Sequence, residues 1–306
     1  QLRSQGVAAD RKEAAEKAVN AGVERDMMNR CYDAHLAALV REGKVSQEKL
    51  DEAVRRVLRL KFRLGLFERP YTPESEETDR FLLPASLAVA ERLAEESMVL
   101  LKNENNTLPL KAARRIAVIG PMAQNRLHLL GAWSAHGREE DAVSLFAGLE
   151  NEYRGCDFDG EDRSGFREAV AAAAAADVVV LCPGEKKQWS GENASRSTIA
   201  LPEIQEQLAA ELAQTGKPLV LVLSSGRPLE LCRLEPLCGA MVQMWQPGIR
   251  GGNPLAGILS GRINPSGRLA MTFPRSTGQN PISYNRRQRG RTHQRKYQDN
   301  PRTPLY

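Results

Sequence analysis

The second half of the chain alternates short apolar runs with segments of helical spacing. The apolar runs predict buried strands at 116–119, 178–182, 219–223 and 241–245. Apolar residues at helical intervals predict helices at 169–176, 204–213 and 253–260. Apolar strands that alternate with helices are typical of a mostly parallel sheet covered by helices on both faces. We therefore expect an α/β domain, a sandwich of sheet and helices, over residues 95–285.

The first 66 residues carry helical patterns and no long strand. Helices are predicted at 10–21 and 27–41. A third helix is predicted to begin after Ser46, a good N-cap, and to stop at Gly65. Three helices without a sheet do not easily form a domain of their own, so we expect them to be the end of a larger one.

Between these two parts, prolines and an acidic run predict a linker over about 68–84. A helix is predicted next, over 86–102. It leads into a turn-forming stretch at 103–106.

The composition excludes several classes of protein. A chain of 306 residues is long enough for about two domains. With 42% hydrophobic and 26% charged residues it can form packed cores, so general disorder is excluded. The aromatic content of 5% argues against a protein that stacks nucleic-acid bases. No window approaches the roughly 18 apolar residues of a membrane span. No targeting signal follows Gln1, where we expect that the beginning is missing.

The net charge of +5 is concentrated at one end of the sequence. Seven Arg or Lys residues and one Asp lie within 285–306, so the rest of the chain is close to neutral. We interpret this segment as a solvated basic tail and expect no nucleic-acid partner. The five cysteines are not spaced as zinc ligands, and the four histidines show no metal pattern. We expect no metal.

In open α/β sheets, ligands bind outside the carboxyl ends of the strands, so the loops there are the first candidates. After the first strand, Gly120 is followed by Pro121, without a Gly-x-Gly-x-x-Gly fingerprint or a Walker lysine. We therefore expect no nucleotide cofactor. The stretch 223–227 lacks the first Gly of Gly-x-Ser-x-Gly, which argues against a nucleophilic serine.

The loop after the second strand, 183–196, is the strongest candidate site. It gathers two carboxylates, Glu185 and Glu192, with Trp189, two lysines and Arg196. Such a set suits a polar ligand, because a Trp offers an aromatic face to a sugar ring and a carboxylic acid can transfer a proton. The alternative is a solvated surface loop without chemistry, and composition alone does not decide between the two.

Six stretches of the chain resemble glycoside hydrolase family 3, and within it the bacterial periplasmic β-glucosidase type. They are RRVLRLKFRLGLFERPY (55–71), SMVLLKNENNTLPL (97–110), IAVIGP (116–121), WSGENASR (189–196), PLVLVLSSGRP (218–228) and NPSGRLAMTFP (264–274). The resemblance runs along nearly the whole chain.

The resemblance implies a (β/α)8-like barrel, an α/β sandwich domain and often a fibronectin type III-like domain. Residues 1–67 would be the C-terminal helices of a truncated barrel, and 68–94 a linker with a lead-in helix. Residues 95–285 would be the sandwich domain, and 286–306 a basic segment leading to a missing fibronectin type III-like domain. The nucleophilic Asp of such relatives belongs to the barrel, shortly before a stretch like 6–11, so we expect it to be missing here.

The same resemblance implies a retaining, exo-acting β-glucosidase that hydrolyses terminal non-reducing β-D-glucosyl residues. Such an enzyme needs two carboxyl groups about 5–5.5 Å apart, one a nucleophile and the other an acid/base. Glu192, in Ser-Gly-Glu-Asn-Ala-Ser-Arg, matches the acid/base of the family, and Glu185 is the alternative. The resemblance assigns substrate binding to Trp189, Arg196, Asp26 and Met27.

One position departs from the family pattern. Arg25 stands where relatives tend to have an apolar residue near the sugar pocket, which puts the geometry of that pocket in question. Without the barrel, Glu192 would face water, so we expect the chain by itself to be inactive.

The resemblance also implies the partners. They are a β-linked gluco-oligosaccharide or aryl β-glucoside and the missing N-terminal barrel of the same polypeptide, in the periplasm, with no cofactor, nucleic acid or membrane. Two alternatives stay open: a β-xylosidase, and a non-catalytic carbohydrate-binding or interaction module with the same fold.

Overall fold

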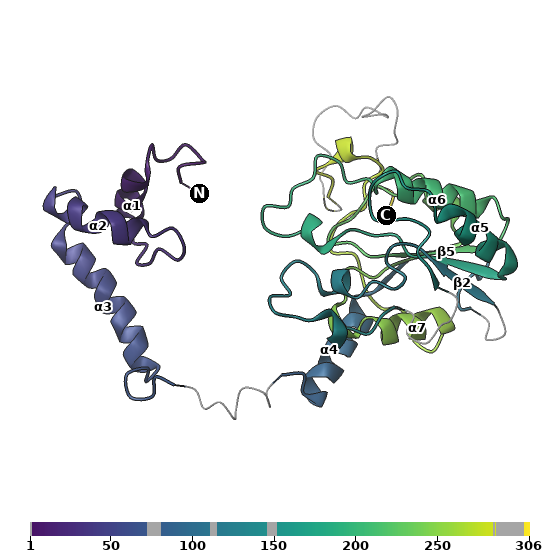
Figure 1. Ribbon diagram of the computed structural model, residues 1–306, viewed down its shortest axis with the longest axis horizontal. Helices are drawn as coiled ribbons and strands as arrows, with labels where there is room; N and C mark the ends of the chain where they lie inside the picture. Colours follow the sequence, from purple (N-terminus) through teal and green to yellow (C-terminus); the bar gives the residue numbers. More distant parts are fainter. Residues whose placement is uncertain (1, 72–80, 111–114, 146–151, 284, 286–302) are drawn as a thin grey trace. The chain divides into compact units, whose positions relative to one another are not determined.

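The computed structural model describes residues 2–71, 81–110, 115–145, 152–283, 285 and 303–306. Contacts within the chain divide it into two compact units, Gln1–Phe81 and Leu82–Tyr306. Figure 1 labels the main elements of both.

The first unit is helical in its described part. Its helices are α1 (Arg11–Asn20), α2 (Cys31–Arg41) and α3 (Gln47–Arg63). A small core holds them together, made of Ala15, Val19, Leu39 and Val45.

Both predicted ends of α3 are confirmed. The Ser46 hydroxyl accepts a hydrogen bond from the Lys49 N–H at 3.3 Å, as an N-cap does. At the other end, Gly65 adopts φ +68, a left-handed conformation that costs glycine little. The N–H groups of Gly65 and Leu66 then donate to carbonyls of the last helical turn, at 2.9 and 3.1 Å.

The predicted start of α2 at residue 27 is wrong, because the helix begins at Cys31. The Asp26 carboxylate accepts the N–H groups of Asn29 and Cys31, at 3.1 and 2.5 Å. Arg30, directly before the helix, has φ +54. The side chain of Asp26 therefore stabilises a bend where the apolar spacing alone suggested a helix.

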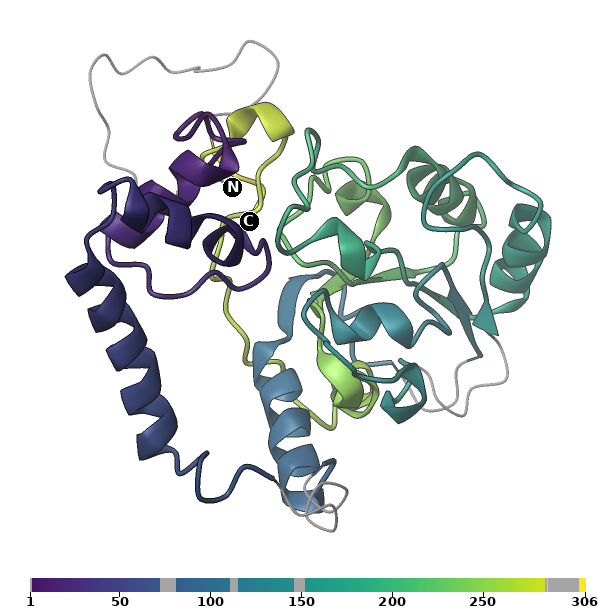
Figure 2. The same cartoon turned by 60° about the vertical axis from the view of Figure 1, so that its left-hand side comes forward.

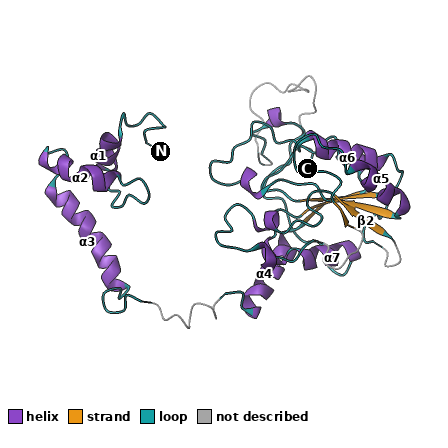
Figure 3. Ribbon diagram, in the orientation of Figure 1, coloured by secondary structure: helices purple, strands orange, loops and turns teal. Residues whose placement is uncertain are grey.

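The second unit is built on a six-stranded sheet, in the order β1-β6-β5-β4-β2-β3. Its strands are β1 (Val99–Asn103), β2 (Ile116–Ile119), β3 (Glu152–Tyr153), β4 (Val178–Leu181), β5 (Leu219–Leu223) and β6 (Ala240–Gln243). Neighbouring strands are parallel except β1, which pairs antiparallel with β6 at the edge. The expected mostly parallel α/β sheet is confirmed, and Figure 3 shows the strands inside the unit.

Helices cover both faces of this sheet. They are α4 (Pro84–Ser97), α5 (Phe166–Ala175), α6 (Glu203–Ala213) and α7 (Gly252–Ser260). Val179 and Leu181 of β4 join the buried cluster under α5 and α6, whereas Val178 and Val180 join the cluster under α7. Figure 2 shows α4 beside α7. Burial on both faces is the reason that β4 reads as a continuous apolar run.

Short 3₁₀ turns lie in the connections of this unit. They are at Leu127–Leu130, Glu139–Asp141, Lys187–Trp189, Glu235–Leu237, Gly248–Arg250 and Thr277–Gln279. Two of them, at 127–130 and 187–189, contact each other next to the candidate site.

Two further element predictions need correction, and one strand was not predicted. The helix predicted over 86–102 ends at Ser97, and 99–103 is strand β1, because these residues pair with β6 instead of continuing the helix. The two-residue strand β3 has no sequence signal. Strand β6 ends at Gln243, because Trp245 turns the chain with φ +58.

Two predicted segments lie largely outside the described residues. The linker over 68–84 includes 72–80, and the basic segment includes 286–302. Among the helices that the structure describes, none combines the length and the apolar character needed to cross a membrane.

Candidate active site

The loops that follow β4 and β5 meet at the carboxyl edge of the sheet. Gly184 and Ser224, one residue from each loop, form a parallel bridge. The Ser190 hydroxyl accepts a hydrogen bond from the amide of Gln246, at 3.2 Å, from the loop after β6. A Cβ atom on Gly226 would overlap the Ser190 side chain, so the two loops are in close contact. This is the edge at which α/β sheets bind ligands.

Glu185, near the start of the loop 183–196, is part of a buried ion-pair cluster. Its side chain has 0% exposure, and Arg196 Nη1 lies 2.7 Å from its Oε1. Arg227 Nε lies 3.3 Å from the other oxygen, close enough for an ion pair but not aligned as a hydrogen bond. A buried carboxylate is stable only with such charge compensation. The two arginines therefore compensate the charge of Glu185 and hold its carboxylate in the interior of the protein.

Glu192 has the opposite environment. It is exposed and forms no hydrogen bond or ion pair with any residue that the structure describes. It lies in a tight turn closed by the Ala194 N–H, which donates to the Gly191 carbonyl at 3.3 Å. Gly191 and Asn193, on either side of it, have φ +99 and +59. The turn thus presents the Glu192 carboxylate to the solvent.

Glu192 lines a hollow of about 340 Å³. The other lining residues are Ala132, Trp133, Lys187, Gln188, Ser190 and Asn193. The Trp133 side chain is 75% exposed, so it offers an apolar surface next to the carboxylate. Lys187 lies at the same hollow and donates to the Ser134 hydroxyl at 3.2 Å. An exposed aromatic ring beside an unpaired carboxylate is an arrangement that can bind and protonate a sugar.

Trp189 is placed differently from Trp133. It is half-buried, and two cations lie over its ring, Arg196 at 5.1 Å and Lys186 at 5.3 Å from the ring centre. These contacts stabilise the loop, and they leave Trp133 as the accessible aromatic surface of the hollow.

The sequence analysis missed Trp133 and Arg227. Trp133 follows β2 and Arg227 follows β5, so both lie in strand-end loops at the carboxyl edge of the sheet. An exposed Trp in a polar loop was an available signal for the first. Arg227 lies in the stretch 218–228 that carries the family resemblance, but its pairing with Glu185 has no signal in the sequence, because the two residues are distant along the chain.

His128 contacts the loop 183–196 from the interior of the unit. It is buried, its ring packs edge-on against Phe158, and its Nδ1 accepts the Lys187 N–H at 3.4 Å. Burial, and then the charges of Lys186 and Lys187, lower the pKa of His128 below its usual value. The neutral ring can therefore keep its acceptor role.

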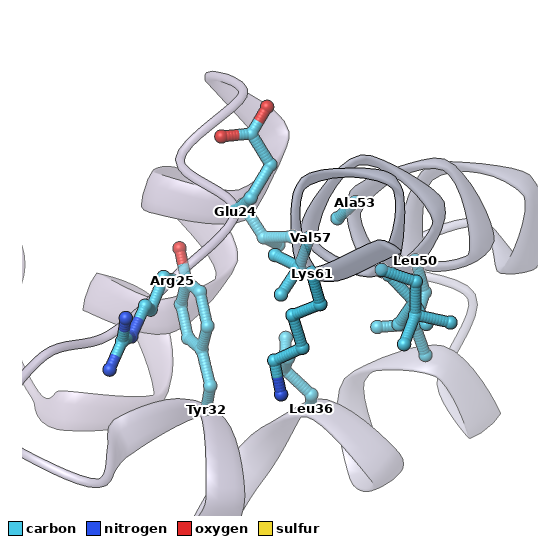
Figure 4. A pocket seen from close by; sticks show the side chains of 11 residues that line it. Glu24, Arg25, Tyr32, Leu36, Leu50, Ala53, Val57 and Lys61 are labelled. Atoms are coloured by element: carbon cyan, nitrogen blue, oxygen red, sulfur yellow. The ribbon is translucent and has the colours of Figure 1, made fainter. Parts of the chain in front are cut away.

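Asp26 and Met27 belong to the first unit. Burial raises the pKa of Asp26, but the backbone N–H groups of Cys31 and Asn29 outweigh this, so the pKa lies below its usual value. Met27 is 80% exposed. A pocket of about 400 Å³ in this unit is lined by neither residue, although Arg25 does line it. Figure 4 shows that pocket between α2 and α3, with Tyr32, Leu36 and Leu50 around it.

Comparison with known proteins decides the family. Residues 98–306 match the glycosyl hydrolase family 3 C-terminal domain. The chain belongs to glycosyl hydrolase family 3. The resemblance seen in the six sequence stretches is confirmed.

The family relatives carry glycosidase names. A periplasmic β-glucosidase of Salmonella typhimurium is 36% identical over 100% of this chain and 46% of its own length. A β-xylosidase of Formosa agariphila is 33% identical, over 91% of this chain and 42% of its own length. The crystal structure of a β-glucosidase from Listeria innocua is 40% identical with a TM-score of 0.90, over 100% of this chain and 44% of that one. The chain thus spans a little under half the length of these relatives.

The family 3 domain match contains the whole site of the second unit. Glu185, Trp189, Glu192 and Arg196 all fall within 98–306, whereas Asp26 and Met27 precede it. Within the part of the chain that the structure describes, no cluster of three or more His, Cys, Asp or Glu side chains is suited to a metal ion.

Proposed function

We propose that this chain supplies the acid/base domain of a retaining, exo-acting β-glucosidase and that Glu192 is the acid/base. The observation that carries the proposal is the contrast between the two candidate carboxylates. Glu192 is exposed beside Trp133 in the hollow, whereas both oxygens of Glu185 face arginines in the interior. Only Glu192 is accessible to a glycosidic oxygen.

In the first step, Glu192 donates its proton to the oxygen of the departing aglycone while a carboxylate attacks the anomeric carbon. In the second step, Glu192 takes a proton from water while the water oxygen attacks the anomeric carbon and displaces the nucleophilic carboxylate, which releases glucose. We assign the nucleophile to the barrel of the longer polypeptide, as the family resemblance implies.

The substrate class rests on the relatives. The Listeria innocua β-glucosidase has been solved in complex with glucose, and a mutant of it in complex with laminaribiose. We therefore propose β-linked gluco-oligosaccharides or aryl β-glucosides as substrates. We also propose a periplasmic location, because the Salmonella typhimurium relative is named periplasmic.

In this proposal, Trp189 and Arg196 act on the substrate through the shape of the Glu192 loop, since Arg196 lies over the Trp189 ring and pairs with Glu185. Asp26 and Met27 stay predicted sugar ligands of the first unit.

A β-xylosidase is the second candidate function. The Formosa agariphila relative favours it, and so does a solved family 3 exo-β-xylosidase that is 28% identical over 89% of this chain. The values of kcat/KM for 4-nitrophenyl β-glucoside and β-xyloside decide between the two substrates.

The test is Glu192→Ala in the longer polypeptide that carries both this chain and the barrel. We expect hydrolysis of an alkyl or sugar glucoside to fall by about 10² to 10⁴, the usual contribution of a general acid. A 2,4-dinitrophenyl glucoside should lose much less in its first step, because its leaving group needs no proton. Glu161→Ala, an exposed Glu outside the hollow, is the matched control. Equal losses for both leaving groups would contradict the acid role. Sugar binding without hydrolysis would support a carbohydrate-binding module.

A further inference from the structure

Both ends of the turn that carries Glu192 are hydrogen-bonded to one guanidinium group. Arg227 Nη2 donates to the Trp189 carbonyl before the turn and, at 3.2 Å, to the Ala194 carbonyl at its end. Both ends of the segment 189–194 are thus held by a single side chain. That side chain comes from the loop after β5, the strand next to β4.

The guanidinium is itself held from the interior side. Its Nε faces the Glu185 carboxylate at 3.3 Å, and the Glu185 side chain is completely buried. The other oxygen of Glu185 pairs with Arg196, which lies at the far end of the same loop. A planar guanidinium has several donors in a fixed arrangement, so Glu185 on one side orients the donors that face the two carbonyls.

The other contacts of this turn are packing contacts and one hydrogen bond between neutral groups. Gly191 lies against Ala132 and Trp133, and Ser190 lies against Gly226. The Glu192 side chain contacts no partner by hydrogen bond or ion pair in the described residues, so it does not hold its own position. Ser190 is held by Gln246, but only through a hydroxyl at 3.2 Å. The contacts of Arg227 are charge-assisted and therefore stronger.

We infer that Arg227, oriented by the buried Glu185, is a positioning residue that holds the Glu192 turn at the rim of the hollow. Only the catalytic consequence of this inference rests on the proposed function. Proton transfer depends on placement, because an acid has to reach the glycosidic oxygen within hydrogen-bond distance. A turn that is released from Arg227 would still carry Glu192 but would not keep it at that distance.

The first experiment is hydrogen exchange of the 306-residue chain, read by mass spectrometry. The protected amides of Trp189 and Ala194, which donate to Lys186 and Gly191, report on the turn. In Arg227→Met these two amides should exchange at least about tenfold faster, because the turn loses charge-assisted hydrogen bonds. Strands β4 and β5 should keep their exchange rates. Arg233→Met is the matched control, since Arg233 pairs with Glu206 on the surface.

Unchanged exchange of the turn in Arg227→Met overturns the inference. An equal increase in the turn, β4 and β5 also overturns it, because that is the result of a general structural role. If Arg227→Met does not fold, hydrogen exchange of the turn and of β4 and β5 is measured in Arg227→Lys instead, and the same two outcomes overturn the inference. Lys keeps the positive charge beside Glu185 but lacks the planar set of donors that faces both Glu185 and the two carbonyls.

The second readout is the dependence of hydrolysis on the leaving group, in the longer polypeptide. In Arg227→Met, kcat for a poor leaving group should fall by about 10-fold or more, while the 2,4-dinitrophenyl glucoside and both KM values change little. Equal loss for both leaving groups overturns the catalytic part of the inference. If Glu192→Ala has no effect, the proposed acid/base role fails, but hydrogen exchange still decides whether Arg227 holds the turn.

Discussion

At the scale of residues, two glutamates of one loop have opposite environments. Glu185 is buried between Arg196 and Arg227, while Glu192 is exposed in the hollow. Both follow a glycine, so the local sequence does not separate them. The separation comes from Arg196 and from Arg227, a residue of another strand-end loop, because both pair with Glu185 and neither pairs with Glu192.

His128 leads to a prediction about pH. An ordinary histidine binds a proton as the pH falls through about 6.5, and in the unfolded chain His128 does the same. In the folded protein its pKa is lower, because of burial and then of Lys186 and Lys187. The unfolded state therefore binds more protons below this pH, and the free energy of unfolding should decrease as the pH is lowered.

Urea unfolding at about pH 7.5 and about pH 5.5, on either side of the usual histidine pKa, measures the free energy of unfolding of the second unit and tests this prediction. His128→Asn keeps a side-chain acceptor for the Lys187 N–H and should show a smaller loss of stability between the two pH values. His136→Asn, at an exposed position, is the control. The same pH dependence in His128→Asn and the unchanged chain would contradict the prediction.

At the scale of elements, α3 is determined by residues near its own ends, whereas β1 depends on a strand that is distant in the sequence. The ends of α3 depend on Ser46 and Gly65, residues at the ends themselves, and both ends were predicted. Strand β1 follows directly after α4 and continues an apolar pattern that suits either structure. It is a strand because β6 offers an unpaired edge, and that edge is far away in the sequence.

The ion pairs of Lys102, a residue of β1, should contribute to the stability of this edge of the sheet. Its ammonium group lies 3.0 Å from Glu235 and 3.3 Å from Glu104, with 9% side-chain exposure. It also donates to the Glu235 carbonyl at 2.8 Å. Lys102→Ala should lower the free energy of unfolding of the second unit by about 1.5–3 kcal/mol, the range for hydrogen bonds of charged groups.

Chemical denaturation with tryptophan fluorescence checks this value, since Trp245 donates to the carbonyl of Ser97, the last residue of α4. Arg167→Ala, an exposed position on α5, is the matched control and should stay within about 0.5 kcal/mol of the unchanged chain. A loss in Lys102→Ala no larger than in the control would show that the ion pairs contribute nothing to this edge.

At the scale of the whole molecule, the chain is a family 3 domain preceded by a helical unit. The sheet order places the loops after β4 and β5 side by side, and these loops carry Glu192, Glu185 and Arg227. The retaining reaction needs a second carboxyl group about 5–5.5 Å from the acid/base. The described residues that line the hollow include no carboxylate besides Glu192.

We therefore expect the 306-residue chain by itself to fold but not to hydrolyse an aryl β-glucoside. Circular dichroism checks the folding, and release of 4-nitrophenol from its β-glucoside checks the activity. The longer polypeptide with the barrel is the positive control. Turnover by the chain alone that disappears in Glu192→Ala would contradict our assignment of the nucleophile to the barrel.

The sequence by itself determined β2 and β5 to the residue, the α/β class, the family and the loop that carries the candidate site. These follow from local patterns, because a strand buried on both faces is apolar throughout and a motif is contiguous. Only the tertiary structure decided that Glu185 is buried between two arginines, that Arg227 donates to both ends of the Glu192 turn and that 99–103 is a strand. Each of these depends on burial and pairing between residues that the fold brings together from distant parts of the chain.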